Sequence, residues 1–118
     1  MGLVSDSPQT ACLHDRWKII PDLLYHGADT SRLDGRGFAP LHLAAIKGHA
    51  KCVAALCRHK GLDMEATDSR FNSTALALAA AKGNFDCVKE LLKRGADKNA
   101  VNASKNSRFE GMLADCNL

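Results

Sequence analysis

The chain has 118 residues and a net charge of +3 at neutral pH, which fits one small domain or a segment of a larger protein. It contains no run of about 18 apolar residues, and its N-terminus lacks the pattern of a secretory signal, so we expect no membrane span. Aromatic residues make up only 5% of the sequence, which disfavours a large mixed core and favours thin layers of packed helices.

The N-terminal segment predicts a short first helix. Residues 1–6 are expected to be flexible. Ser7 followed by Pro8 is typical of an N-cap and a first helical position, because the serine oxygen accepts a backbone N–H and proline needs no N–H there. The pattern predicts a helix over about 8–14.

Apolar residues at positions 17, 19, 20, 23 and 24 predict a second helix that ends near Gly27. Pro21 falls inside this stretch and is tolerated only in a first helical turn, so the helix must begin late, near residues 18–20. The turn before it carries Asp15 at a place where the later, more regular parts of the chain have glycine.

Residues 37–57 form the most regular part of the chain. Pro40 suits a first helical turn, and Gly48 ends that helix where a left-handed conformation is favoured. A second helix follows, whose apolar residues are spaced at i, i+1, i+4 and i+5, namely Cys52, Val53, Leu56 and Cys57. Two helices of this size bury too little surface to be stable alone, so we expect them to pack against similar neighbours.

A second copy of the pattern follows about 34 residues later, and Asp34, Asp68 and Asn102 mark equivalent positions. In this copy Asn72 replaces the turn glycine, and asparagine is a usual substitute where φ is positive. Apolar residues after Phe109 predict the first helix of a further copy. The chain is therefore expected to consist of repeated helix pairs.

The sequence resembles the ankyrin-repeat family, whose repeats are about 33 residues long. Residues 39–44 read Ala-Pro-Leu-His-Leu-Ala, where the family has Thr-Pro-Leu-His-x-Ala, and residues 91–100 are close to the family's repeat ending. The resemblance implies an all-α solenoid of stacked helix-turn-helix units with β-turn finger loops. It divides the chain into a flexible start, a degenerate first repeat, two near-complete repeats and a partial capping repeat, at residues 1–6, 7–33, 34–67, 68–101 and 102–118.

No catalytic site is expected from the sequence. His42 and His49 occupy motif positions, where the resemblance implies structural hydrogen bonds to neighbouring backbone. The other three histidines, His14, His26 and His59, have no cysteine or carboxylate at zinc-ligand spacing. The chain also lacks a phosphate-binding loop and a nucleophile motif. We therefore predict a protein that is not an enzyme and that needs no metal and no cofactor.

The five cysteines form no C-x-x-C pair. Cys52 and Cys87 fall at matching places in two repeats where a buried aliphatic residue is expected, so we interpret them as core residues and not as ligands or disulfides. This cysteine usage favours a reducing compartment, and we predict an intracellular protein of the cytoplasm, the nucleus or both.

The resemblance implies that the fingers and first helices line one concave face that binds a protein partner. Carried over by position, the contact residues are Arg36, Phe38, Ile46, Lys47, Arg70, Phe71, Ser73 and Lys82. The segment 32–60 has six basic residues against one acidic residue, so we expect an acidic partner, with Phe38 as an apolar anchor. A solvated basic face without a partner is the alternative, since lysine before the turn glycine is common in such repeats.

Other functions stay open at this point. The chain can be the ankyrin appendage of a larger enzyme, channel or signalling protein, or its basic face can bind nucleic acid weakly. Scarce aromatic residues and a modest net charge argue against nucleic acid. We expect a monomer that does not bind membranes. Asn99 resembles sites that asparaginyl hydroxylases modify, although a turn asparagine that bonds its own backbone explains it as well.

Overall fold

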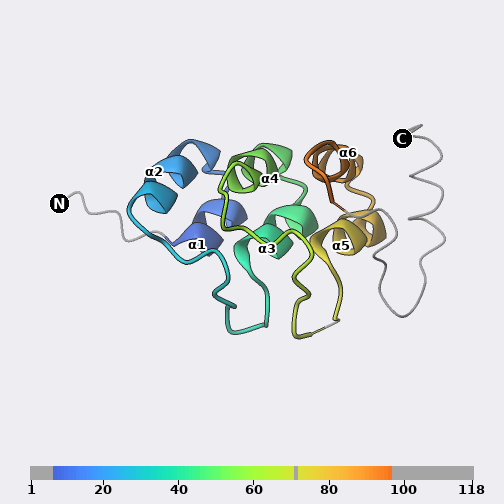
Figure 1. The fold of residues 1–118 in the computed structure, drawn as a ribbon. Coiled ribbons are helices and arrows are strands. Elements are labelled where there is room, and N and C mark those ends of the chain that lie inside the picture. The colour runs from blue at the N-terminus through green and yellow to red at the C-terminus, as the bar shows by residue number, and fades with distance from the viewer. Residues whose placement is uncertain (1–6, 71, 97–118) are drawn as a thin grey trace.

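The computed structural model describes residues 7–70 and 72–96, and all regular structure within these ranges is helical. The helices lie in two layers, with α1, α3 and α5 in an inner layer and α2, α4 and α6 in an outer layer (Figure 1). The predicted all-α stack of helix pairs is therefore confirmed. The elements are α1 (Pro8–Leu13), η1 (Trp17–Ile19, a 3-10 helix), α2 (Ile20–Tyr25), α3 (Pro40–Lys47), α4 (Ala50–Cys57), α5 (Ala75–Lys82) and α6 (Phe85–Lys93).

The first helix pair forms as its sequence predicts. The Ser7 side chain accepts a backbone hydrogen bond at 3.2 Å and caps α1, and Pro8 occupies the first turn of that helix. Pro21 lies in the first turn of α2, where its missing N–H is not needed, and η1 supplies the turn before it. The late start of the second helix is therefore confirmed.

Left-handed turns follow the inner helices. Gly48 and Gly83 have φ values of 79° and 74° after α3 and α5, as glycine at these places predicts. Asp15 takes the equivalent place after α1 with a φ of 55°. Asn72 precedes α5 with a φ of 53°, which confirms the prediction that asparagine stands there for a turn glycine.

The starts of α3 and α5 are capped differently. Ala39 has no side-chain oxygen, and its N–H donates to Nδ1 of His42 at 3.0 Å. Thr74 caps α5 with its hydroxyl, which accepts a hydrogen bond from the Ala77 N–H at 3.2 Å. α3 thus lacks the usual capping oxygen, and His42 satisfies one backbone donor in its place.

The core lies between the two layers and between neighbouring helix pairs. In the inner layer α3 packs against both α1 and α5, and in the outer layer α4 packs against α2 and α6. Ala44 and Ala79 are fully buried, and their small side chains let the inner helices approach closely. The largest fully buried apolar side chains include Ile20, Leu43, Leu56, Leu76 and Leu91. Because this burial is shared, no pair has a core of its own.

Two finger loops join the helix pairs and project from the side of the inner layer (Figure 1). In the first finger the Asp34 carboxylate accepts hydrogen bonds from the backbone N–H groups of Arg36 and Phe38, at 2.9 and 3.0 Å. Asp68 binds two backbone N–H groups of the second finger in the same way. The repeated aspartate therefore fixes the shape of each finger.

Several predictions fall outside the described residues and stay predictions. They concern the flexible start at 1–6, Phe71, Asn99 and the partial repeat at 102–118. Among the described helices, none has the length and apolar character needed to cross a membrane.

Candidate functional site

The predicted partner face begins at the finger tips. Arg36 and Arg70 are exposed on neighbouring fingers. Beside them, the Ser69 N–H donates a hydrogen bond to the Gly37 carbonyl at 3.0 Å, which joins one finger to the next. The two guanidinium groups are therefore carried by loops that lie side by side.

The Arg36 guanidinium is held between two groups of its own finger. It pairs with the Asp34 carboxylate at 3.4 Å and lies 5.8 Å from the centre of the Phe38 ring. Burial opposes the charge of Asp34, but hydrogen bonds from the Phe38 and Arg36 N–H groups and the Arg36 charge prevail and lower the pKa of this carboxyl. With its side chain 52% exposed, Arg36 remains accessible from outside.

The structure corrects two of the predicted contact residues. Phe38 is only 5% exposed and packs into the core, because the finger folds its ring back onto the helices. It supports Arg36 but cannot serve as an exposed apolar anchor. Ser73 is 1% exposed, and its N–H is bound to Asp68 at the base of the second finger. Ile46, another apolar residue among the predicted contacts, is half-buried and so remains partly accessible.

The inner helices add a second pair of cations. Lys47 and Lys82 are exposed at the ends of α3 and α5, each directly before a left-handed glycine. Asn84 holds the two corners together, because its side-chain amide donates hydrogen bonds to the carbonyls of Ala45 and Ile46, the latter at 2.9 Å. Within residues 7–70 and 72–96, neither lysine has an acidic partner.

Not all of the counted basic charge lies on this face. Lys51 and Arg58 belong to the outer layer, where they line a groove of about 380 Å³ between η1, α2 and α4. The floor of the groove is apolar and contains Trp17, with the Lys51 ammonium 5.1 Å from its ring centre. The basic residues of segment 32–60 therefore belong to two surfaces, because Lys47 ends α3 in the inner layer whereas Lys51, four residues later, lies on α4 in the outer layer.

The two motif histidines bond backbone, as predicted. His42 accepts the Ala39 N–H at Nδ1, so Nε2 carries the proton and donates to the Ala66 carbonyl at 2.9 Å. His49 donates from Nδ1 to the Cys12 carbonyl at 2.6 Å and so links the second helix pair to the first. Both imidazoles therefore have structural roles.

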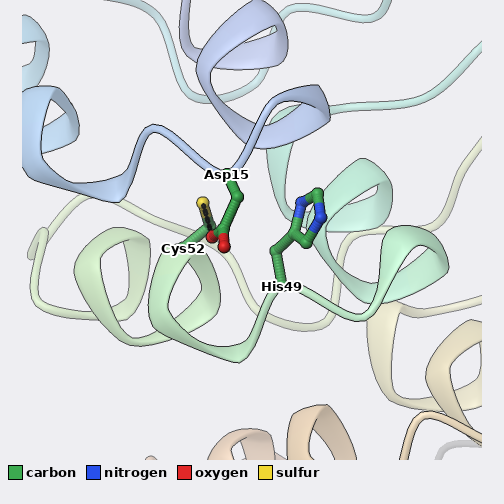
Figure 2. A group of neighbouring side chains, drawn as sticks. All are labelled: Asp15, His49 and Cys52. Carbon is green, nitrogen blue, oxygen red and sulfur yellow. Dashed lines mark hydrogen bonds between the residues drawn. The ribbon is translucent and has the colours of Figure 1, made fainter.

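A group of possible metal ligands lies next to His49 and was not predicted. Donor atoms of Asp15, His49 and Cys52 all lie within 4.8 Å of one another at the junction of the first two helix pairs (Figure 2). The Cys52 thiol is fully buried and donates to an Asp15 carboxylate oxygen at 3.6 Å. Cys12 adjoins the group, since its hydrogen bond with the Cys52 thiol, followed by burial, raises the pKa of Cys12 well above the ordinary value.

The other described cysteines are ordinary core thiols. Cys87 is buried, as predicted, and Cys57 is half-buried, and none of the four described cysteines forms a disulfide. Burial raises the pKa of Cys57 to about 11 and that of Cys87 to about 12, so both thiols stay protonated at neutral pH. Because the thiolate is the reactive form, these two thiols are expected to be unreactive.

One sequence signal for the group near His49 was available. Cys12 and Asp15 are separated by two residues, and so are His49 and Cys52. Paired donors at this spacing are typical of metal sites. The signal is easily missed because His49 and Cys52 also satisfy the repeat pattern, and only the packing of two helix pairs brings the halves together.

Comparisons with known proteins agree with the repeat architecture. The family model for ankyrin repeats, in three copies, matches residues 9–102. The chain is 36% identical over 91 residues to ankyrin repeat protein nuc-2 of Neurospora crassa, a match that covers 77% of this chain and 8% of that protein. It is 35% identical over 85 residues to ankyrin repeat and SOCS box protein 3 of Bos taurus, covering 71% of this chain and 16% of that protein.

A third relative matches more strongly over a shorter segment. Ankyrin repeat and SAM domain-containing protein 6 of Mus musculus is 45% identical over 65 residues, covering 55% of this chain and 7% of that protein. The chain thus spans less than a fifth of the length of each of these three relatives. In each relative the matched part is a small region of a larger protein.

Proposed function

The chain belongs to the ankyrin-repeat family, whose repeats are non-catalytic protein-interaction modules, and we propose that it binds an acidic segment of a partner protein through its basic inner face. We define the basic inner face as Arg36, Arg70, Ile46, Lys47 and Lys82. The observation that carries the proposal is the repetition of exposed cations at equivalent places on adjacent fingers and adjacent inner helices. Such a row matches carboxylates spaced along an extended segment and raises the rate of encounter with it.

The inner face also has the rigidity that such binding needs. Arg36 is restrained by Asp34 and Phe38, and the two Lys-Gly corners are fixed by the Asn84 hydrogen bonds. Cations held in place lose less conformational entropy on binding than free side chains do. The half-buried Ile46, next to Lys47 on α3, supplies a small apolar contact.

The test uses two matched charge-reversal variants of the chain. Arg36→Glu with Lys47→Glu alters the inner face, and Lys51→Glu with Arg58→Glu makes the same change of charge on the outer layer. The native chain is used to capture partners from cell extract, and association rates are then measured with the captured protein at low and high salt. We expect the inner-face variant to associate about tenfold more slowly, with a weaker salt dependence.

The outer-layer variant is the control for net charge. Its association should change much less than that of the inner-face variant. If both variants lose the same amount, only overall charge matters and the proposed face is refuted. Binding of duplex nucleic acid with affinity lost in the inner-face variant would favour the nucleic-acid alternative over a protein partner.

A second candidate is that the chain acts as the ankyrin appendage of a larger protein. The relatives favour it, because their matched repeats make up 8% and 16% of nuc-2 and of ankyrin repeat and SOCS box protein 3. Sequencing of the full transcript tests it directly, and an open reading frame that adds no further domain would contradict it.

We also propose that the protein works as a monomer in a reducing compartment. Cys12, Cys52 and Cys87 are buried free thiols, as expected where disulfides do not persist. Blocking of free thiols in cell extract, followed by non-reducing electrophoresis, shows whether the cysteines are reduced in the cell and whether the chain forms disulfide-linked dimers. A disulfide that forms in the native cell would contradict it.

A further inference from the structure

Three metal-binding side chains meet where the first helix pair packs on the second, and Cys12 adjoins them. Asp15, His49 and Cys52 have donor atoms within 4.8 Å of one another (Figure 2). Cys12 is fully buried, and its carbonyl accepts the hydrogen bond from His49. Together the four side chains offer two sulfur donors, one imidazole and one carboxylate. They come from two short segments, each with its donors separated by two residues.

The junction between the second and third helix pairs provides an internal comparison. There the side chain of Asn84 donates to backbone as His49 does, and the Cys87 thiol donates to the Ala44 carbonyl at 3.7 Å as Cys52 does to Ala11, at 3.9 Å. At this second junction, one side-chain amide and one thiol therefore supply the hydrogen bonds that link one helix pair to the next.

Two departures from the repeat pattern turn the first junction into a donor set. Cys12 stands where α3 and α5 have the buried alanines Ala45 and Ala80. Asp15 stands where glycine is favoured and holds a φ of 55°, a conformation that a non-glycine residue adopts only at some conformational expense. Both departures lie at the same group, because the Asp15 carboxylate accepts a hydrogen bond from the Cys52 thiol and the Cys12 carbonyl accepts one from His49. Packing alone requires neither of them.

We propose that Cys12, Asp15, His49 and Cys52 form a zinc site that fastens the first helix pair to the second. Two sulfurs, one nitrogen and one oxygen suit a tetrahedral Zn²⁺ ion better than Mg²⁺ or Ca²⁺, which prefer oxygen ligands. This proposal revises the expectation from sequence that the chain needs no metal, and it is independent of the proposed partner face.

Binding requires a small adjustment of the group. Zinc ligands lie about 2.0–2.3 Å from the ion, so the donor atoms must draw closer than the present 4.8 Å spread. His49 Nδ1 now carries a proton that it donates to the Cys12 carbonyl, so coordination needs either a turn of the ring or transfer of that proton to Nε2. Each thiol that coordinates releases its proton to solvent, where buffer takes it up.

The test uses the full chain, reduced and freed of metal with a chelator. Titration with Co²⁺, a spectroscopic substitute for Zn²⁺, should give one equivalent of binding, the charge-transfer absorption of a cobalt–thiolate bond and the visible bands of tetrahedral geometry. Zn²⁺ should displace the Co²⁺ and raise the melting temperature, whereas Mg²⁺ should do neither. Octahedral bands without thiolate absorption would overturn the proposal.

Variants taken from the chain's own repeats separate metal binding from folding. Cys12→Ala, Asp15→Gly and His49→Asn each install the residue found at the second junction, so the fold should be kept. Each is expected to weaken Zn²⁺ binding by at least about 100-fold. This is more than the loss caused by removing a residue that only hydrogen-bonds to a metal ligand. Cys87→Ala, the matched control, should bind as the native chain does. Equal binding by all four variants would place the metal elsewhere and refute the site.

Discussion

At the scale of single residues, the fingers show how one missing side chain sets a contact between repeats. Gly37 has a φ of 91°, and a Cβ there would lie 2.2 Å from the Ser69 hydroxyl of the next finger. Gly27 has nearly the same φ, 87°, but nothing lies within 4 Å of its Cβ position. Comparison of these two glycines therefore distinguishes the effect of backbone strain from that of crowding between fingers.

We predict that Gly27→Ala lowers the free energy of unfolding by about 1 kcal/mol, the cost of a left-handed alanine. Gly37→Ala should lower it by about 1 kcal/mol more, because the added methyl must displace the Ser69 hydroxyl. Urea denaturation measures both. In a Ser69→Ala background the difference between the two variants should shrink, and an unchanged difference would contradict finger crowding as its cause.

Asp34 makes the first finger sensitive to acid. Its pKa is lowered in the folded chain, since hydrogen bonds from two N–H groups and the Arg36 charge outweigh the burial that opposes them. A carboxyl whose pKa is lower in the folded chain than its ordinary value of 3.8 stabilises the fold at pH values above 3.8. This contribution to stability is lost as the pH falls below 3.8.

We therefore predict that Asp34→Asn destabilises the chain by about 1 kcal/mol at neutral pH, where hydrogen bonds to the charged carboxylate are lost. The gap between native and variant chains should close as the pH is lowered through the range below 3.8. Thermal denaturation at a series of pH values measures it. A gap that stays constant over this range would show that the charge of Asp34 is not what holds the finger.

At the scale of helices, capping distinguishes two otherwise similar inner helices. Thr74 is the N-cap residue of α5 and its hydroxyl accepts the Ala77 N–H, whereas the N-cap residue of α3 is Ala39, which has no such acceptor. We predict that Thr74→Ala lowers the free energy of unfolding by about 1 kcal/mol. Hydrogen exchange should show the largest loss of protection in the first turn of α5, and a loss confined to other helices would contradict the capping role.

At the scale of the whole molecule, local signals fixed the helices and tertiary packing decided the surface. Pro21, Gly48 and Asn72 act through their own backbone angles, so the sequence alone predicted the helix starts and turns correctly. Phe38 was misplaced because its burial depends on how the finger folds back on the helices. Cys52 was recognised as a core residue, but its neighbour Asp15 lies 37 residues away and reaches it only through stacking.

The same stacking makes the helix pairs depend on one another for stability. Leu56 is fully buried on α4, in the middle of the outer layer, where α2 and α6 both pack against that helix. We predict that Leu56→Ala lowers the free energy of unfolding by about 2–5 kcal/mol and removes hydrogen-exchange protection from all the described helices together. Tyr25→Ala, at an 85% exposed position, should change it by less than about 0.5 kcal/mol.

Calorimetry distinguishes this shared core from independent units. One cooperative transition that moves to lower temperature in Leu56→Ala is expected, because no helix pair retains a core of its own when its neighbour opens. If the variant instead melts in two steps, with one helix pair intact after the first, then each pair buries enough surface to stand alone. Such a result would remove the reason that the chain has repeats at all.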